Sequence, residues 1–389
     1  MKIIFILSST ITHGGGTKAF MQMLMGGIKH GIKPLVILPD NNGIYKILTK
    51  NKIPCKALHL HYRMSVYPWK TTILDKLLFL PRLIGRFSVN SLATIQLLKI
   101  TKQFKPDIIH TNVSVVAIGY YVARLLKIPH VWHIREYGDL DFNLYHYPSR
   151  KVQLCKYKCL NSYTLCITKD IQQHNNLYQW KNSRVIYDGV LSNSLLTYQK
   201  NKAPYFLFAG RIEKAKGILP LLDAYAIYCQ QHPAPLLLYI AGNGSLEYTK
   251  IVKDKILQYG IEDRVVFLGM RDDILALYQK AKALIVPSLS EGFGFITAEA
   301  MFSGCLVIGN DVAGTREQFD NGKEITGEEI ALRYTTQKEL VQHLIDVTNN
   351  DIDYYEPMIR RAQQVVAQLY SVEEHAKQVY DLYLKILKK

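Results

Sequence analysis

Two carboxylates eight positions apart, Glu291 and Glu299, give residues 291–299 the clearest chemical signature in the chain. On a continuous helix they would be offset by roughly 80°. We therefore interpret them as two side chains that contact one ligand from different directions, rather than as a pair exposed on the protein surface. The alternative is that Glu299 only complements a helix dipole and Glu291 is solvated. Between them lie residues that could line a ligand: Gly292, Phe293, Gly294, Phe295 and Ile296.

The elements around these carboxylates are those of a strand–loop–helix–strand unit. The apolar run 283–286 predicts a buried strand that ends at Pro287, and a helix is expected to begin near Ile296. The run 305–308 predicts the next strand. The first N–H groups of a helix are unpaired and lie at the positive end of its dipole, so this loop is a potential anion site.

A second potential anion site lies between a predicted strand at 205–209 and the helix after it, in the run Gly-Arg-x4-Lys-Gly at 210–217. The five-residue spacing lets Arg211 and Lys216 converge on one diphosphate. Arginine supplies a planar fork and lysine a point charge. The alternative is a solvated basic turn.

Two features of the first half could also meet a ligand. A glycine turn at 14–16, which includes Gly15 and Gly16, follows the predicted strand 3–7 and allows close backbone approach. It matches neither a dinucleotide fingerprint nor a Walker loop, so a plain tight turn is an equal alternative. His133, Arg135 and Glu136 end a later strand, at the sheet edge where such folds bind ligands. The alternative for His133 is a buried structural imidazole.

The Glu-x7-Glu run with Gly-Phe-Gly inside it resembles the signature of the GT-B retaining glycosyltransferases of family 4, the group 1 glycosyltransferases. The Gly-Arg-x4-Lys-Gly run matches that family's diphosphate-binding loop. The resemblance spans nearly the whole chain and is stronger in the second half. It implies an α/β fold with two doubly wound parallel-sheet, Rossmann-like domains facing a central cleft. The C-terminal helix would cross back to the first domain.

The resemblance also implies roles for individual residues. Glu299 would bind ribose hydroxyls, Glu291 would contact the donor sugar, and the anomeric configuration would be retained. Gly15 and Gly16 would lie beside the diphosphate and the acceptor. His133 would lie close to the transferred sugar, and the turn containing Met270 would face the nucleotide base. The catalytic set would be Glu291, His133, Arg211 and Lys216.

Four positions depart from the family pattern. Near His133, Arg135 and Glu136 differ from the commonest version, in which an acidic residue directly follows the histidine. Asp188 stands where an asparagine is usual, and Ala313 replaces the first glycine of a Gly-Gly-x-x-Glu turn.

Length and composition indicate the number of domains, the location of the protein and the state of its cysteines. The 389 residues suggest a first domain at 1–195, a second at 196–370 and a terminal helix at 371–389. No apolar stretch reaches the roughly 18 residues of a membrane span, and the N-terminus reads as a strand rather than a signal peptide, so a cytoplasmic protein is expected. The six scattered cysteines indicate reduced thiols rather than a zinc site.

Charge is distributed unevenly. Residues 1–190 carry 26 Lys and Arg against 8 Asp and Glu, and residues 191–389 carry 22 against 24, so the halves have net charges of +18 and −2. The first half should therefore face something anionic: nucleic acid, a membrane surface or a phosphorylated substrate. The segment 61–105 suits a helix pair on an anionic bilayer, or an ordinary pair covering the sheet. Its aromatic and basic residues include Tyr67, Trp69, Lys70, Lys76, Arg82 and Arg86.

The function expected from these observations is sugar transfer from a nucleoside diphosphate, UDP more readily than GDP, to an acceptor hydroxyl. The acceptor would be a glycan or a lipid-linked saccharide in cell-surface polysaccharide or glycolipid synthesis, at the inner face of the membrane. No metal or other cofactor is expected, because Arg211, Lys216 and the helix N-terminus near Ile296 can stabilise the leaving diphosphate. Alternatives are a sugar-nucleotide epimerase, a binding module without activity and a nucleic-acid-binding protein. The last leaves the glutamate pair unexplained, so no nucleic acid partner is expected.

Overall fold

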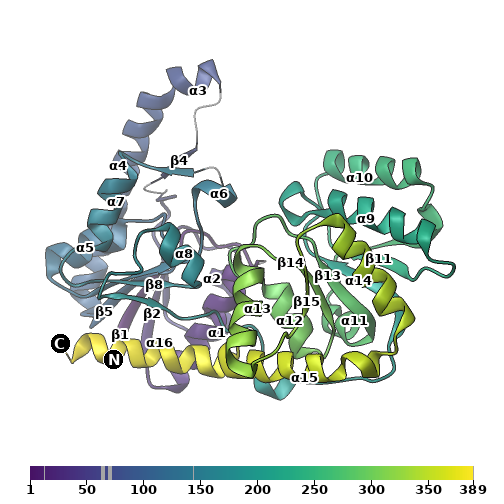
Figure 1. Cartoon of the computed structure of the whole chain (residues 1–389). Helices are drawn as coiled ribbons and strands as arrows, with labels where there is room; N and C mark the ends of the chain where they lie inside the picture. The colour runs from purple at the N-terminus through teal and green to yellow at the C-terminus, as the bar shows by residue number, and fades with distance from the viewer. Residues whose placement is uncertain (13, 63–65, 69–71, 143, 389) are drawn as a thin grey trace. The chain divides into compact units, whose positions relative to one another are not determined.

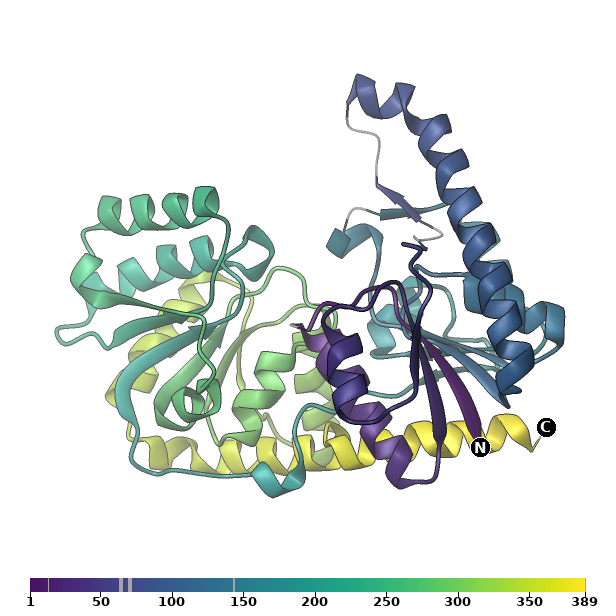
Figure 2. The same cartoon turned by 180° about the vertical axis from the view of Figure 1, so that it is seen from behind.

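The computed structural model describes residues 1–12, 14–62, 66–68, 72–142 and 144–388. The chain divides into two compact units, Met1–Gly189 with His375–Lys389, and Val190–Glu374. Each unit is built on a parallel sheet with helices on its faces (Figures 1 and 2), which is the α/β architecture expected.

The chain leaves and re-enters the first unit at neighbouring points. The Val190 N–H donates to the Tyr370 carbonyl at 2.8 Å, and Leu191 bridges Ser371. This pairing ties residues 190–191 to residues 370–371, so both belong to the second unit. The divisions therefore fall at 189/190 and 374/375, a few residues from the sequence-based 195/196 and 370/371.

The first unit contains a seven-stranded sheet in the order β3-β2-β1-β5-β6-β8-β9, with every pair parallel. Its strands are β1 (Lys2–Ile6), β2 (Lys33–Leu38), β3 (Cys55–Ala57), β5 (Ile108–Thr111), β6 (His130–Ile134), β8 (Ser162–Cys166) and β9 (Ser183–Val185). A separate antiparallel pair joins β4 (Val66–Pro68) to β7 (Leu144–His146).

Alternation along β1 sorts the helices of this unit onto two faces. Ile3 and Phe5 pack with α1, α2 and α16, whereas Ile4 and Ile6 pack with α4 and α5. The C-terminal helix α16 thus belongs to the first unit's core, as expected. The helices are α1 (Gly15–Lys29), α2 (Ile44–Lys50), α3 (Ile73–Leu77), α4 (Phe79–Phe104), α5 (Ile118–Leu126), α6 (Asp139–Phe142), α7 (Arg150–Tyr157), α8 (Lys169–His174) and α16 (Val372–Leu387).

The second unit has a six-stranded parallel sheet in the order β12-β11-β10-β13-β14-β15. Its strands are β10 (Ala203–Ala209), β11 (Leu237–Ala241), β12 (Val265–Gly269), β13 (Ala281–Val286), β14 (Val307–Asn310) and β15 (Leu332–Tyr334). Its helices are α9 (Ile218–Gln231), α10 (Leu246–Tyr259), α11 (Ile274–Lys280), α12 (Phe295–Phe302), α13 (Ala313–Thr326), α14 (Gln337–Asn349) and α15 (Ile352–Leu369).

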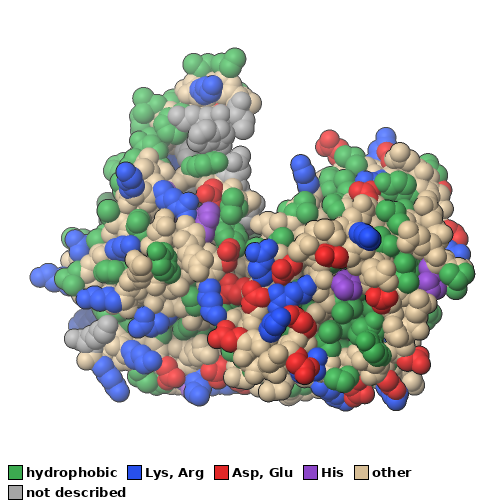
Figure 3. Space-filling model, viewed as in Figure 1, with side chains coloured by type: hydrophobic (Ala, Val, Ile, Leu, Met, Phe, Trp, Pro, Cys, Tyr) green, Lys and Arg blue, Asp and Glu red, His purple; other side chains and the backbone are tan. Residues whose placement is uncertain are grey.

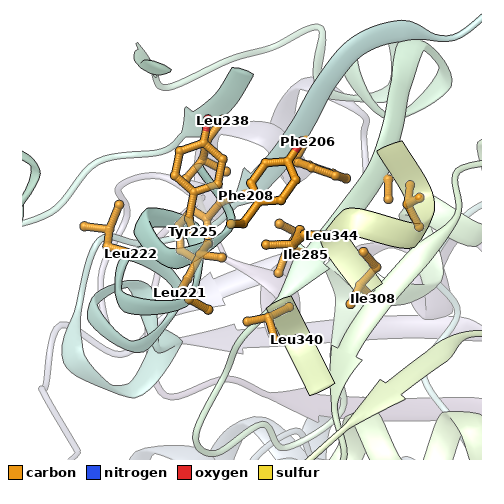
Figure 4. Close-up of a cluster of buried hydrophobic side chains, with 14 of the residues drawn as sticks. Phe206, Phe208, Leu221, Leu222, Tyr225, Leu238, Ile285, Ile308, Leu340 and Leu344 are labelled. Atoms are coloured by element: carbon orange, nitrogen blue, oxygen red, sulfur yellow. The ribbon is translucent and has the colours of Figure 1, made fainter. Parts of the chain in front are cut away.

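One face of this sheet is covered by α9 and α14. Phe206 and Phe208 of β10 project into a cluster with Leu221 and Tyr225 of α9 and Leu344 of α14 (Figure 4). These side chains are at most 1% exposed. Burial of this size fixes the strands firmly, so the loops at their carboxyl ends have a rigid base.

No helix in the described part of the chain is both long and apolar enough to cross a bilayer.

Candidate functional site

The second unit's sheet has a topological switch point between β10 and β13. These strands are neighbours, and the chain continues outward from them on opposite sides, to β11 and β12 and to β14 and β15. In open α/β sheets, ligands bind beyond the carboxyl ends of strands at such a point. The loop at 210–217 follows β10 and the loop at 287–294 follows β13. The two sequence-predicted anion sites therefore meet at one place.

Backbone contacts hold these two loops together. The Leu289 N–H donates to the Ala215 carbonyl at 2.9 Å. Gly217 has φ +70°, and a Cβ added there would lie 1.8 Å from the Pro287 carbonyl oxygen. Only glycine permits this approach, because any side chain would push the loops apart.

Lys216 and Glu291 form an ion pair across the two loops. Lys216 Nζ lies 2.7 Å from Glu291 Oε2, and the side chains are 19% and 14% exposed. The Ser288 hydroxyl donates to the same carboxylate oxygen at 3.2 Å. The pair is partly desolvated, so its charges act more strongly than they would in open water.

Helix α12 begins directly beyond this pair. Gly294 caps it with φ +91°, and the Gln318 side-chain amide donates to the Gly294 carbonyl at 3.0 Å. The Gly314 N–H donates to the Glu291 carbonyl at 2.8 Å, so the start of α13 is hydrogen-bonded to the loop. The helix N-terminus at Phe295 and Ile296 is therefore held beside the Lys216–Glu291 pair.

Phe293 is one predicted ligand residue with a structural side chain. It is 2% exposed and its ring packs edge-on against Phe295 and Tyr370, at centroid distances of 5.2 and 5.4 Å. Only its backbone could contact a ligand, together with that of the half-buried Gly292.

Glu299 lies one turn inside α12 and is half-buried. The Tyr278 hydroxyl donates to Glu299 Oε2 at 3.5 Å. Burial, and then the nearby Glu299 charge, raise the pKa of Tyr278 well above its ordinary value. Tyr278 therefore stays a neutral donor that orients the carboxylate. Sequence reasoning missed it, because nothing in the α11 pattern links it to Glu299.

Arg211 does not share a partner with Lys216. Its guanidinium is 69% exposed and pairs with Glu213 at 3.0 Å. It lines a separate hollow of about 450 Å³ together with Asn243, Ser245 and Tyr248. Met270, beyond β12, is 66% exposed. The expected convergence of Arg211 and Lys216 on one diphosphate is not seen in the structure.

The first unit has its own switch point, between β1 and β5. Gly15 and Gly16 begin α1, the helix that follows β1 in the sequence. A Cβ added to Gly16 would lie 3.8 Å from Arg135 Cδ. The glycine turn therefore lies against Arg135, which also donates to Asn112 Oδ1 at 3.3 Å and pairs with Asp188.

His133 lies inside the first unit rather than at its surface. Its imidazole is fully buried, with Nδ1 3.2 Å from His110 Nε2 and 3.3 Å from an Arg135 nitrogen. Arginine can only donate, so His133 Nδ1 accepts and its proton sits on Nε2, 3.9 Å from Asp188 Oδ1. The predicted contact with a sugar would need these neighbours to move.

The residues around His133 come from sequence segments that lie far apart in the first unit. His375 of α16 stacks on His133 at 6.3 Å, and the Tyr383 hydroxyl lies 2.6 Å from His110 Nδ1. Burial, then the Arg135 charge and neighbouring histidines, hold the pKa values of His110 and His133 well below the ordinary range. Burial also lowers that of His375, against the opposing effect of Asp188. We call His110, His133, His375, Arg135, Asp188 and Tyr383 the histidine network.

Glu136 has a structural role. Its carboxylate is 8% exposed and accepts hydrogen bonds from the Ser114 N–H at 2.8 Å and the Ser114 hydroxyl at 2.7 Å. It fixes the loop after β5 and leaves Arg135 to face Asp188.

Two Asp-x-Asp runs, at 139–141 and 351–353, contain the paired carboxylates that can bind a divalent metal ion. Sequence reasoning overlooked both. Asp139 pairs with His174 and Arg150, and Asp353 pairs with Lys200. Within the residues that the structure describes, no group of three or more His, Cys, Asp or Glu could hold a metal ion.

Ala313 is strained where the family pattern has glycine. It has φ +45° at the start of α13, a conformation that costs an L-residue roughly 1–2 kcal/mol. Ala313→Gly is therefore expected to stabilise the second unit by up to about 1 kcal/mol after the added freedom of the unfolded chain is counted. Thermal unfolding measures this, with Ala276→Gly, at an exposed position of α11, as a control expected to destabilise. A lower midpoint for Ala313→Gly would contradict the assignment of strain.

Comparisons with known proteins show what this chain is similar to. Residues 197–365 match the family model described as Glycosyl transferases group 1. An uncharacterized glycosyltransferase of Methanocaldococcus jannaschii is 30% identical over 179 residues, 46% of this chain and 44% of its own. The O-antigen chain mannosyltransferase RfbU of Salmonella typhimurium is 30% identical over 173 residues, 44% of this chain and 46% of its own. The chain thus spans less than half the length of these curated relatives.

Solved structures extend the likeness to the whole fold. Anabaena Alr3699/HepE in complex with UDP has a TM-score of 0.75 at 20% identity and covers 99% of this chain and 100% of that one. The predicted fold is confirmed: the chain has the GT-B fold, and residues 197–365 are similar to the group 1 glycosyltransferases.

Proposed function

We propose that this chain transfers a sugar from a nucleoside diphosphate to an acceptor hydroxyl, and that its second unit binds the donor. The observation that carries the proposal is the Lys216–Glu291 pair, held at the switch point beside the N-terminus of α12. A cation, a carboxylate and free helix N–H groups are the groups that a diphosphate and a sugar hydroxyl require.

The chemistry follows from the charge that develops on the leaving diphosphate. The Lys216 ammonium and the N–H groups at Phe295 and Ile296 stabilise that charge as the glycosidic bond breaks. A bound phosphate draws Lys216 away from Glu291, which frees the carboxylate to accept a hydrogen bond from the donor sugar. Glu299, oriented by Tyr278, accepts hydrogen bonds from the ribose hydroxyls. The product keeps the donor's anomeric configuration, and Lys216 with the N–H groups of α12 makes a metal ion unnecessary.

We propose a UDP-sugar as donor, since structures that share this fold are complexes with UDP and with UDP-glucose. For the acceptor, we propose a saccharide carried on a lipid, reached at the inner face of the cell membrane. The net charge of +18 in residues 1–190 supports this choice, and a mannosyltransferase of O-antigen chains is among the relatives.

A thermal-shift panel with UDP, GDP, CDP, ADP and NAD, each with and without EDTA, tests the donor site. A diphosphate at 100 times its dissociation constant should stabilise the protein by about 2.7 kcal/mol. We expect the largest shift with UDP, unchanged by EDTA and lost in Lys216→Ala. A shift that EDTA abolishes would overturn metal independence, and no shift with any nucleotide would overturn the donor site.

A further inference from the structure

Helix α3 and the part of α4 before Ala93, which we call the arm, expose a row of large apolar side chains. Both cartoon views show the arm extending away from the first unit's sheet, and Figure 3 shows hydrophobic side chains along it. The most exposed members are between 60% and 78% exposed: Ile73, Leu77, Leu80, Ile84 and Phe87.

These residues follow helical spacing, with successive steps of four, three, four and three positions. Such a stripe normally faces a protein core. Here α3 buries no residue, and the buried residues of α4 are Ala93, Leu97 and Thr101, all beyond the arm. Among the residues that the structure describes, the stripe on the arm therefore has no core to pack on, and exposed apolar surface of this extent marks an interaction site.

A groove continues from the stripe toward the body of the unit. It has a volume of about 740 Å³ and runs between α4 and α5. Ile84 and Phe87 of the arm line it together with Ile118 of α5, and Arg86 and Lys156 lie at the same surface. An apolar trough with cations beside it fits a molecule that has an apolar chain and an anionic head.

The charge of this region favours lipid over a second copy of the chain. The arm carries three cations, Lys76, Arg82 and Arg86, against a single acid, Asp75. That acid already pairs with Arg82 at 3.0 Å. Two such surfaces would repel each other, whereas an anionic bilayer attracts basic residues and accepts apolar side chains at the headgroup boundary.

We propose that the arm binds the surface of an anionic membrane. The apolar stripe inserts at the boundary between headgroups and acyl chains, Arg86 and Lys156 contact lipid phosphates, and the groove holds one lipid acyl chain. The proposal rests on the proposed function only for its purpose, which is to bring the enzyme to a lipid-linked acceptor. Binding itself can be measured without turnover. Trp69 and Lys70, which sequence reasoning placed on this surface, lie outside the described residues.

Flotation with vesicles of phosphatidylcholine, with and without 30% phosphatidylglycerol, tests the proposal. We expect the wild type to float only with the anionic vesicles, and less at high salt. The variant Ile84→Ser/Phe87→Ser keeps every charge and should lose at least tenfold in bound fraction. The matched control is Leu160→Ser, which changes a leucine that is 80% exposed elsewhere in the same unit. Its flotation should equal that of the wild type.

A second measurement addresses the groove directly. Tryptophan introduced as Phe87→Trp should be quenched by lipids brominated in the acyl chain, beyond the quenching of the wild type. No flotation, with a dimer that Ile84→Ser/Phe87→Ser converts to monomers, would overturn the proposal in favour of a second copy. Flotation unchanged in that variant would also overturn it. The UDP-induced thermal shift, measured on the same samples, shows separately whether the donor site is intact.

Discussion

Lys216→Ala is expected to lower kcat for sugar transfer by a factor on the order of 10²–10³, the usual cost of removing one donor that stabilises a developing negative charge. Lys216 is the side-chain cation that lies directly against Glu291, at 2.7 Å. The helix N-terminus at α12 remains in the variant, so activity should fall and not vanish. Steady-state kinetics with the donor identified by the thermal-shift panel measure the effect.

The ion pair allows a sharp control, because removing Lys216 also leaves the Glu291 carboxylate without its cation. If the only role of Lys216 were to neutralise Glu291, the double variant Lys216→Ala/Glu291→Gln would recover activity relative to Lys216→Ala. We expect no recovery, because both a phosphate ligand and a sugar ligand are then missing. Lys338→Ala, which removes an exposed lysine at α14, should leave kcat unchanged.

The fold was predictable because its signals are local. Residues 3–7 form an uninterrupted apolar run, which predicts a buried strand, and the structure packs Ile3 and Phe5 on one side and Ile4 and Ile6 on the other. The two anion-binding loops could also be predicted from the sequence, because glycines precede helices where the backbone must come close to a ligand. Gly217 and Gly294 both have positive φ.

The relations between distant residues were not predictable in the same way. The sequence presents 210–217 and 287–294 as two anion sites, and only the adjacency of β10 and β13 makes them one. Arg211 and Lys216 are close in sequence, yet they pair with different carboxylates. Sequence spacing within a loop does not fix the direction of long side chains, whereas contacts across the sheet edge do.

Two of the departures from the family pattern contact each other in the structure. Arg135 and the buried Asp188 looked like separate substitutions, and they form an ion pair. A buried cation without this partner would be strongly destabilising. Similarly, the segment 61–105 left two alternatives, a membrane-facing pair and a pair covering the sheet. In the structure the buried residues of α4 are Ala93, Leu97 and Thr101, so this part of the helix packs on the first unit.

The free energy of unfolding of the first unit is expected to fall steeply below pH 6.5. Burial holds the pKa values of His110 and His133 well below the ordinary range and lowers that of His130 to about 3. An unfolded histidine has a pKa near 6.5. Above that pH the imidazoles are neutral in both states, so they add no pH dependence. Below it the unfolded state takes up protons that the folded state cannot, and stability falls with pH.

The expected size of this effect is large. Each of the three histidines contributes up to about 1.4 kcal/mol per pH unit, so together they give about 4 kcal/mol per pH unit. Between pH 6.5 and 5 the loss is about 5 kcal/mol, because the unfolded histidines are only half protonated at pH 6.5; this is comparable with the whole stability of a typical domain. His375 adds to it, although the nearby Asp188 opposes the lowering of its pKa.

Urea unfolding followed by tryptophan fluorescence at pH 7.5, 6.5, 6.0 and 5.5 measures this slope in the first unit alone. All three tryptophans, Trp69, Trp132 and Trp180, lie in that unit. His133→Gln should reduce the slope by about 1.4 kcal/mol per pH unit, the share of one proton. His61→Gln, which changes an exposed histidine outside the histidine network, should leave it unchanged. A free energy of unfolding that stays flat from pH 7.5 to 5.5 would show that the buried imidazoles are not held neutral, and the network would then have to admit protons in the folded state.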